Sequence, residues 1–245
     1  MLPVLDYDIL DSTNLEARRL WENGRGPREG FYVAAGVQTA GRGRMGRKWV
    51  SPAGGLWFTL ALPIPEDPRP FQGVSLVAGL AAAEGVDAAA GIRCSVKWPN
   101  DLLAENRKFC GILCEMVLGP PGSVLLVGIG IDANFTASLL GGDLLHPATT
   151  LLEITGRETD LEDLLEKVGE RLEAALERMR TSGLEPFLPP LRERLAYLGE
   201  KVEILLPGGE IRKGVFDGVD SQGRALLRRA QGLEAHLTGD LRPAY

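Results

Sequence analysis

The chain has 245 residues and a formal net charge of −6 at pH 7, with 44% hydrophobic and 24% charged residues. This is an ordinary globular composition, and the length allows one large domain or a large domain with a small one. The acidic balance argues against general nucleic-acid binding, no apolar run is long enough to span a membrane, and three cysteines give no disulfide framework. No signal peptide is visible, so we expect a cytoplasmic protein.

Apolar patterning predicts strands and helices that alternate through most of the chain. In chain order we expect an edge strand at 1–10, a helix at 13–22, strands at 31–37 and 56–62, a helix at 74–91, strands at 93–98, 102–104, 108–117 and 124–131, and helices at 160–180 and 186–198. From residue 199 the pattern changes to four short strands at 201–206, 211–219, 225–229 and 234–237. The sequence thus indicates an α+β fold with a mixed sheet, followed by a small SH3-like β-barrel.

Residues 38–49 (Q-T-A-G-R-G-R-M-G-R-K-W) connect two predicted core strands. Between Arg42 and Lys48 there are four cations and no acid, against the charge of the whole chain. Glycines let a backbone approach a ligand closely, and arginines bind carboxylates and phosphates through paired donors. The loop is therefore a candidate phosphate cradle, although it matches neither a Walker A loop nor a dinucleotide fingerprint. A solvated surface turn is the alternative.

This loop, G-R-G-R-x-G-R-x-W, resembles the signature loop of biotin–protein ligases. Further matches follow in the family's order at residues 12–14 (S-T-N), 97–101 (K-W-P-N-D), 108–113 (K-F-C-G-I-L) and 128–131 (G-I-G-I). The resemblance covers nearly the whole chain. It implies a catalytic domain at 1–198, similar to the cores of class II aminoacyl-tRNA synthetases, and an SH3-like domain at 199–245.

The resemblance also implies an activity. ATP and biotin would give biotinyl-5′-AMP and pyrophosphate, with Mg²⁺ to screen the phosphate charge, after which biotin passes to a lysine of a biotin carboxyl carrier protein domain. We also expect a homodimer. Lipoate–protein ligases and octanoyltransferases share the fold and are an alternative, as is a biotin-sensing repressor. Repressors of the family carry an N-terminal helix-turn-helix segment, whereas this chain starts at the catalytic region, so we expect no DNA binding.

By resemblance, two overlapping groups of residues form the site. Biotin would contact Ser12, Thr13, Asn14, Gln38, Gly41, Arg42, Gly43, Arg44, Lys108 and Gly111. ATP and the adenylate would contact Arg42, Arg44, Trp49, Asn100, Lys108 and Asn134. Lys108 and Arg44 would stabilise charge during adenylation, and Asp101 is a candidate base in the transfer step. The metal ligands are unknown.

Several of these residues have a structural interpretation too. Thr13 with Glu16 fits a helix capping box, Asp101 could simply fix its turn, and Lys108 could sit at an exposed strand start. Strand alternation predicts Lys108, Cys110 and Ile112 on one face, with Cys110 in the core rather than acting as a nucleophile. Asp132 departs from the family, which commonly has asparagine there, so we assign it no role. Arg242 matches a basic position of uncertain role.

Overall fold

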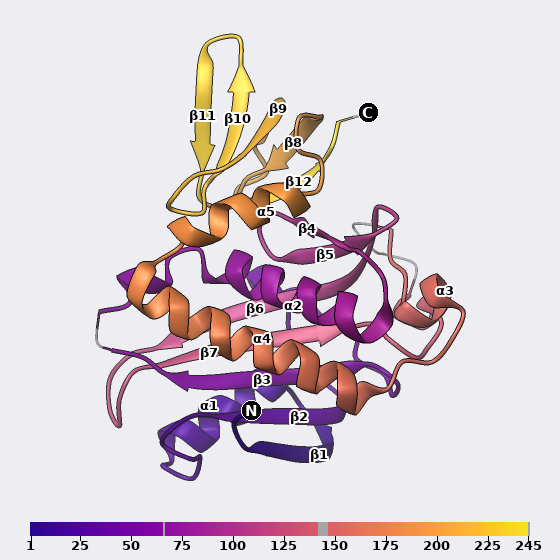
Figure 1. The fold of residues 1–245 in the computed structure, drawn as a ribbon, viewed down its shortest axis with the longest axis vertical. Helices are drawn as coiled ribbons and strands as arrows, with labels where there is room; N and C mark the ends of the chain where they lie inside the picture. Colours follow the sequence, from indigo (N-terminus) through magenta and orange to yellow (C-terminus); the bar gives the residue numbers. More distant parts are fainter. Residues whose placement is uncertain (66, 142–146, 245) are drawn as a thin grey trace.

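A computed structural model describes residues 1–65, 67–141 and 147–244 (Figure 1). Its helices are α1 (Thr13–Glu22), α2 (Val74–Ala90), α3 (Leu151–Thr155), α4 (Leu161–Ser182) and α5 (Leu188–Arg194). Its strands are β1 (Val4–Leu10), β2 (Phe31–Gln38), β3 (Leu56–Pro63), β4 (Ser95–Lys97), β5 (Asp101–Ala104), β6 (Arg107–Val117), β7 (Val124–Ile131), β8 (Lys201–Leu205), β9 (Ile211–Val219), β10 (Ala225–Arg229), β11 (Gly232–His236) and β12 (Asp240–Pro243). Every element expected from the patterning is present.

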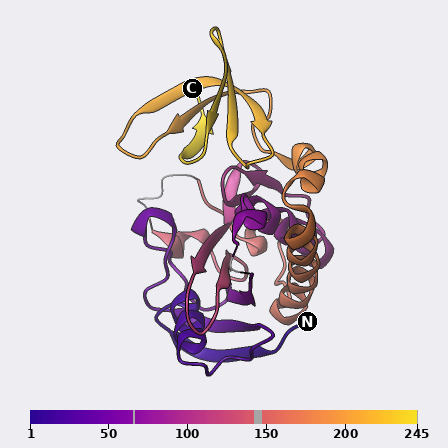
Figure 2. The ribbon, with the colours of Figure 1, turned by 90° about the vertical axis from the view of Figure 1, so that its left-hand side faces the viewer.

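The larger sheet has seven strands in the order β1-β2-β3-β7-β6-β5-β4. Only β1 and β2 run parallel and the other neighbours are antiparallel, so the predicted mixed sheet is confirmed. Figure 2 shows α2 and α4 on one side of this sheet and long connecting loops on the other. The side chains divide accordingly, since Leu125 and Val127 of β7 join the core beneath α2 and α4, whereas Leu126 packs against Ala17 and Trp21 of α1.

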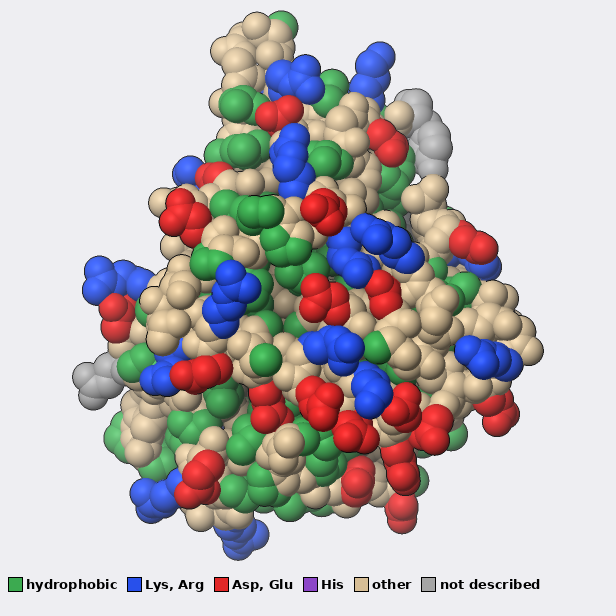
Figure 3. All heavy atoms as spheres, in the orientation of Figure 1, with side chains coloured by type: hydrophobic (Ala, Val, Ile, Leu, Met, Phe, Trp, Pro, Cys, Tyr) green, Lys and Arg blue, Asp and Glu red, His purple; other side chains and the backbone are tan. Residues whose placement is uncertain are grey.

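α2 is one unbroken helix in spite of its glycines. A Cβ at Gly85 would lie 2.6 Å from the Cα of Val168 in α4, so a glycine is what lets these two backbones approach. The helix is buried nearly all round, which is why its sequence has almost no polar face. α4 is the opposite case, since it buries one stripe and presents intermingled acidic and basic side chains to solvent (Figure 3).

The second sheet is antiparallel, in the order β11-β10-β9-β8-β12, and lies beyond α5 from the first (Figure 1). Its last strand, β12, pairs with β8 and was missed because its sequence, D-L-R-P, is short and ends in proline. A hydrogen bond of 3.0 Å connects the two parts of the molecule. It runs from Trp98 Nε1, next to the end of β4, to the carbonyl of Gly223, between β9 and β10. None of the helices in the described ranges is long and apolar enough to cross a membrane.

Three local expectations were wrong. The helix expected at 186–198 is shorter, because α5 ends at Arg194. Thr13 is no cap: α1 starts at Thr13 after Ser12, and the Thr13 hydroxyl turns to Gln38 instead. The alternation expected along β6 fails at a β-bulge, where Leu103 pairs with Lys108 but Leu102 pairs with Cys110.

Candidate functional site

A cavity of about 440 Å³ opens on the sheet face that carries α1. Its volume is in the range of small-molecule sites. Side chains from α1, the loop at 38–50 and strands β6 and β7 surround it. The lining residues are Ser12, Thr13, Asn14, Gln38, Arg42, Gly43, Arg44, Arg47, Lys48, Trp49, Val50, Phe58, Asn100, Lys108, Gly111, Ile112, Leu113, Gly128, Ile129, Gly130, Asp132, Leu140 and Ala148.

Glycines make room for this cavity in the middle of two strands. A Cβ at Gly130 would lie 2.5 Å from Nε1 of Trp49, and one at Gly128 would lie 2.0 Å from Oδ1 of Asn14. A Cβ at Gly111 would approach the Trp49 ring to 3.1 Å. Side chains from the loop and from α1 therefore lie directly on the strand backbones, which only glycine permits.

The end of the cavity near α1 is neutral and closely hydrogen-bonded. Gln38 Oε1 accepts from the Thr13 amide at 2.8 Å and from its hydroxyl at 3.2 Å, while Gln38 Nε2 donates to Ser51 at 2.8 Å. Thr59 of β3, which is fully buried, has its hydroxyl 2.8 Å from Thr13 Oγ1 and 2.6 Å from Asn14 Oδ1. Each polar side chain is thus fixed by a neighbour before any ligand arrives. We call Thr13, Asn14, Gln38, Ser51 and Thr59 the hydroxyl–amide cluster.

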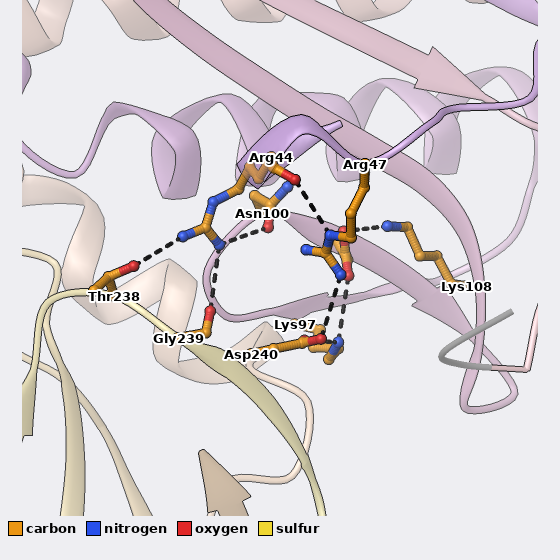
Figure 4. A network of polar contacts seen from close by, with 9 residues as sticks. Arg44, Arg47, Lys97, Asn100, Lys108, Thr238, Gly239 and Asp240 are labelled. Carbon is orange, nitrogen blue, oxygen red and sulfur yellow. Dashed lines mark hydrogen bonds and ion pairs between the residues drawn. The ribbon is translucent and has the colours of Figure 1, made fainter. Parts of the chain in front are cut away.

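The other end is charged. Lys108 Nζ lies 2.6 Å from Asp101 Oδ1, and Lys97 Nζ lies 3.3 Å from Asp101 Oδ2. Lys97 also reaches Asp240 of β12 at 3.0 Å, and Arg47 of the loop lies 3.5 Å from the same carboxylate. Figure 4 shows this chain of ion pairs, which runs from the loop through the second sheet to Lys108.

Arg44 joins the same network but pairs with no carboxylate among residues 1–65, 67–141 and 147–244. Its guanidinium donates to Asn100 Oδ1 at 3.2 Å, to the Gly239 carbonyl at 3.4 Å and to the Thr238 hydroxyl at 3.3 Å (Figure 4). Burial lowers the pKa of Arg44, and the nearby charge of Arg47 adds to this effect. We call Arg44, Arg47, Lys97, Asp101, Lys108 and Asp240 the charged cluster. It holds four cations and two carboxylates, so its charges do not cancel.

Asp101 is ionised in this setting. Its burial acts to raise its pKa, but the ammonium groups of Lys108 and Lys97 together outweigh burial and hold the pKa below its ordinary value. The carboxylate is only 5% exposed and both oxygens face lysines. A carboxylate so engaged is a poor proton acceptor, which weighs against the expected base role and favours one in holding Lys108 in place.

The β6 bulge decides where Lys108 points. Without it, Lys108 would share the core face with Cys110 and Ile112, as the alternation predicted. With it, Lys108 faces the cavity together with Gly111 and lies 5.0 Å from the Trp49 ring centre. Cys110 is fully buried in the core, and burial raises the pKa of its thiol well above the ordinary value, so the core interpretation of Cys110 is confirmed.

The structure brings all but three of the expected site residues to the cavity. Asp101 lies behind Lys108, as described. Gly41 lies beneath the loop, where a Cβ would come within 2.5 Å of the Trp49 carbonyl. Asn134 does not line the cavity. Its Nδ2 donates to the Thr159 carbonyl and its Oδ1 accepts from the Thr159 amide, both at 2.8 Å. Arg242, left without a role, pairs with Glu203 on β8.

Sequence reasoning missed several residues that shape the site. Thr59 could have been found, because it is the only polar residue in the apolar run L-W-F-T-L-A-L. Gly128 and Gly130 carried a signal too, since glycines in a strand interior often mark a close approach. Lys97 was noted only as part of a motif. Nothing in the local sequence indicates that it contacts Asp240, which is 143 positions later in the chain.

Fold and cavity together define an α+β protein with a glycine- and arginine-rich loop over a mixed sheet. Residues 8–132 match the biotin/lipoate A/B protein ligase family and residues 197–240 match the biotin protein ligase C-terminal domain. The chain therefore belongs to the biotin/lipoate A/B protein ligase family.

Among its relatives, the biotin–[acetyl-CoA-carboxylase] ligase of Paracoccus denitrificans is 34% identical, over 91% of this chain and 92% of its own length. The bifunctional ligase/repressor BirA of Salmonella typhimurium is 32% identical, over 95% of this chain and 72% of its own length. The solved structure of the Aquifex aeolicus biotin protein ligase in complex with biotin and ATP superposes with a TM-score of 0.85, at 32% identity and full coverage of both chains.

Proposed function

We propose that this protein is an ATP-dependent biotin–protein ligase. It activates biotin to biotinyl-5′-AMP and transfers the biotin to a lysine of a biotin carboxyl carrier protein domain. The observation that carries the proposal is one cavity with two chemically different ends. The hydroxyl–amide cluster suits a neutral ring that offers both donors and acceptors. The charged cluster, with its excess of cations, suits a carboxylate and a polyphosphate brought together.

The first step joins two anions, so the site must offset their repulsion. Asp101 holds Lys108, and Asn100 and Gly239 hold Arg44. Both cations are therefore oriented before the ligand binds. Donors fixed in this way stabilise developing charge without reorganising. The biotin carboxylate attacks the α-phosphorus, the bond to the bridging oxygen breaks and pyrophosphate leaves. We expect Mg²⁺ to arrive with the nucleotide, because Mg²⁺ is usually held largely by substrate phosphates.

In the second step the amine of the acceptor lysine attacks the mixed anhydride and AMP leaves. No covalent enzyme intermediate is needed. Asp101 supports this step by fixing Lys108, in place of the base role that its position in the sequence suggested. We further propose a domain boundary near residue 199, supported by the start of the second sheet at Lys201. Cytoplasmic residence, a homodimer and the absence of DNA binding stay proposals, which fractionation, light scattering and filter binding test.

The deciding experiment compares carboxylic acids. Pyrophosphate exchange into ATP is measured with biotin, lipoate and octanoate side by side. We expect exchange with biotin alone, because lipoate and octanoate carry no polar ring that could use the further hydrogen-bonding capacity of the hydroxyl–amide cluster. Equal exchange with lipoate would contradict the biotin assignment and favour a lipoate ligase of the same fold.

A further inference from the structure

One buried acid in the cavity has no place in the chemistry described above. Asp132 follows β7, lines the cavity and is 2% exposed. Its backbone is fixed on both sides, since its amide donates to the Phe109 carbonyl at 2.7 Å and its carbonyl accepts from the Leu151 amide at 2.9 Å. Its side-chain Oδ1 is buried and has no hydrogen-bond partner among the residues that the structure describes.

The groups around Asp132 come from three elements. β6 contributes Lys108 on the cavity side and the Cys110 thiol on the core side. α3 contributes one acid, Glu153, which is occupied with the Ala137 amide at 2.8 Å and the Thr149 hydroxyl at 3.2 Å. The loop over the cavity contributes four cations that share its lining, namely Arg42, Arg44, Arg47 and Lys48.

None of these groups is an ion-pair partner of Asp132. Lys108, whose field does favour a charge on Asp132, is already in contact with Asp101 at 2.6 Å. An ionised carboxylate without a close partner is costly to bury, and such groups take up a proton instead. Burial accordingly raises the pKa of Asp132 well above its ordinary value, and Lys108 only partly opposes this.

We propose that Asp132 works as a neutral carboxylic acid whose O–H donates a hydrogen bond to a phosphate oxygen of the bound nucleotide. The inference rests on the proposed function. A carboxylate facing the charged cluster would neutralise cations that the phosphates need and repel the phosphates themselves. The protonated acid adds a donor without adding negative charge, as a carboxylic acid kept neutral by an apolar setting can do. Hydrogen-bond donation by Asp132 then depends on pH, whereas donation by the loop arginines does not, because arginine stays protonated.

The first test needs no activity. An acid whose pKa is higher in the folded than in the unfolded chain, where it is about 3.9, binds more protons when folded. Its contribution to stability is full below the unfolded pKa and is lost as the pH rises through the folded pKa. We expect the urea midpoint of the wild-type protein to fall, relative to that of Asp132→Asn, as the pH rises above the unfolded pKa and through the folded one, because the asparagine cannot titrate. Parallel curves for the two proteins would overturn the proposal.

The second test follows adenylation alone, by biotin-dependent pyrophosphate exchange into ATP, so that the acceptor lysine does not affect the pH profile. Asp132→Asn keeps a donor of the same shape and Asp132→Ala removes it. We expect kcat/KM for ATP in the wild-type enzyme to fall about tenfold per pH unit above the pKa of Asp132. The asparagine variant should lack that fall. The alanine variant should lack it too, and its kcat/KM should be about 10²-fold below that of the asparagine variant at every pH, the effect of losing one placed donor.

A rival role for Asp132 gives opposite results. If the ionised carboxylate bound the Mg²⁺ that accompanies ATP, wild-type activity would rise with pH and Asp132→Asn would need at least tenfold more Mg²⁺ for half-maximal exchange. Either result overturns the proposal. If none of biotin, lipoate and octanoate supports pyrophosphate exchange, the proposed function fails. The urea comparison of the wild type with Asp132→Asn still decides whether Asp132 is neutral.

Discussion

At one end of the cavity Thr13, Asn14 and Gln38 are neutral and bonded to near neighbours of the same sheet face. At the other end Lys108 is held through Asp101 and Lys97 by Asp240, which belongs to the second sheet. The hydroxyl–amide cluster thus uses residues of the first sheet and the elements beside it, whereas the charged cluster also uses a residue of the second sheet. Neutral groups at close range can be positioned locally, whereas an excess of cations requires carboxylates from wherever the fold can supply them.

The largest effect is expected where the charged cluster meets the substrate. Replacing Lys108 by alanine should slow adenylation by about 10²–10³-fold, because it removes one preorganised donor for the developing phosphate charge. The free energy of unfolding should fall by about 1–3 kcal/mol, because the buried Asp101 carboxylate loses one of its two lysine partners and keeps Lys97. The exposed Lys201→Ala is the matched control. Near-normal exchange in Lys108→Ala would return this lysine to a structural role.

Asp101→Asn distinguishes positioning from base catalysis. We expect both half-reactions to slow about tenfold, because a hydrogen bond between charged groups contributes about 1.5–3 kcal/mol to holding Lys108. Single-turnover assays of adenylate formation and of transfer measure the two steps separately. A normal first step with a slow second step, partly restored by raising the pH, would instead support Asp101 as the base in transfer.

Asp240→Asn tests whether the charged cluster needs the second sheet. Lys97 is 1% exposed and loses one charged partner in this variant, so we expect a loss of about 1–3 kcal/mol in the free energy of unfolding and a raised KM for ATP. The KM for biotin should be unchanged. Asp217→Asn, whose pair with Arg228 is partly exposed, is the control and should cost less than about 1 kcal/mol. An equal change in both KM values would show that the two ends are not independent.

Thr59→Val sharpens the other side of the comparison. The substitution keeps the shape of a fully buried side chain and removes the hydroxyl that contacts Thr13 and Asn14. Leaving those two groups without this partner costs about 1–2 kcal/mol, so the KM for biotin should rise about tenfold while the KM for ATP stays constant. Steady-state exchange with each substrate varied in turn measures both. A raised KM for ATP with an unchanged KM for biotin would contradict the assignment of Thr59 to the hydroxyl–amide cluster.

The smallest effect is that of salt. Raising the ionic strength from about 0.05 to 0.3 M shortens the screening length, which should raise the KM for ATP a few-fold and leave the KM for biotin nearly constant. The buried pairs of Lys97 and Asp101 limit the size of the change, because salt screens them less. Potassium chloride at constant free Mg²⁺ is the suitable titration. Equal salt dependence of both KM values would argue against a neutral and a charged end.

Local patterns were sufficient to predict the strands and helices, and the ordered motifs were sufficient to predict the family. They failed where a position depends on partners far along the chain. The bulge in β6 arises from how β5 and β6 pair, and it reverses the side on which Lys108 lies. Asp240 is in an unremarkable T-G-D-L-R segment, and its importance comes only from the approach of β12 to Lys97. The roles assigned to individual site residues stay predictions until the variants are measured.

The contacts that hold the loop have a consequence for how the protein is made. Arg44 bonds Thr238 and Gly239, which lie 194 and 195 positions later in the chain, and Arg47 pairs with Asp240. A ribosome synthesises these partners after every strand of the first sheet, so a nascent chain can complete that sheet and the hydroxyl–amide cluster before the loop is held in place. Termination of the chain before Thr238 would therefore leave a folded first sheet with a loop that lacks these contacts.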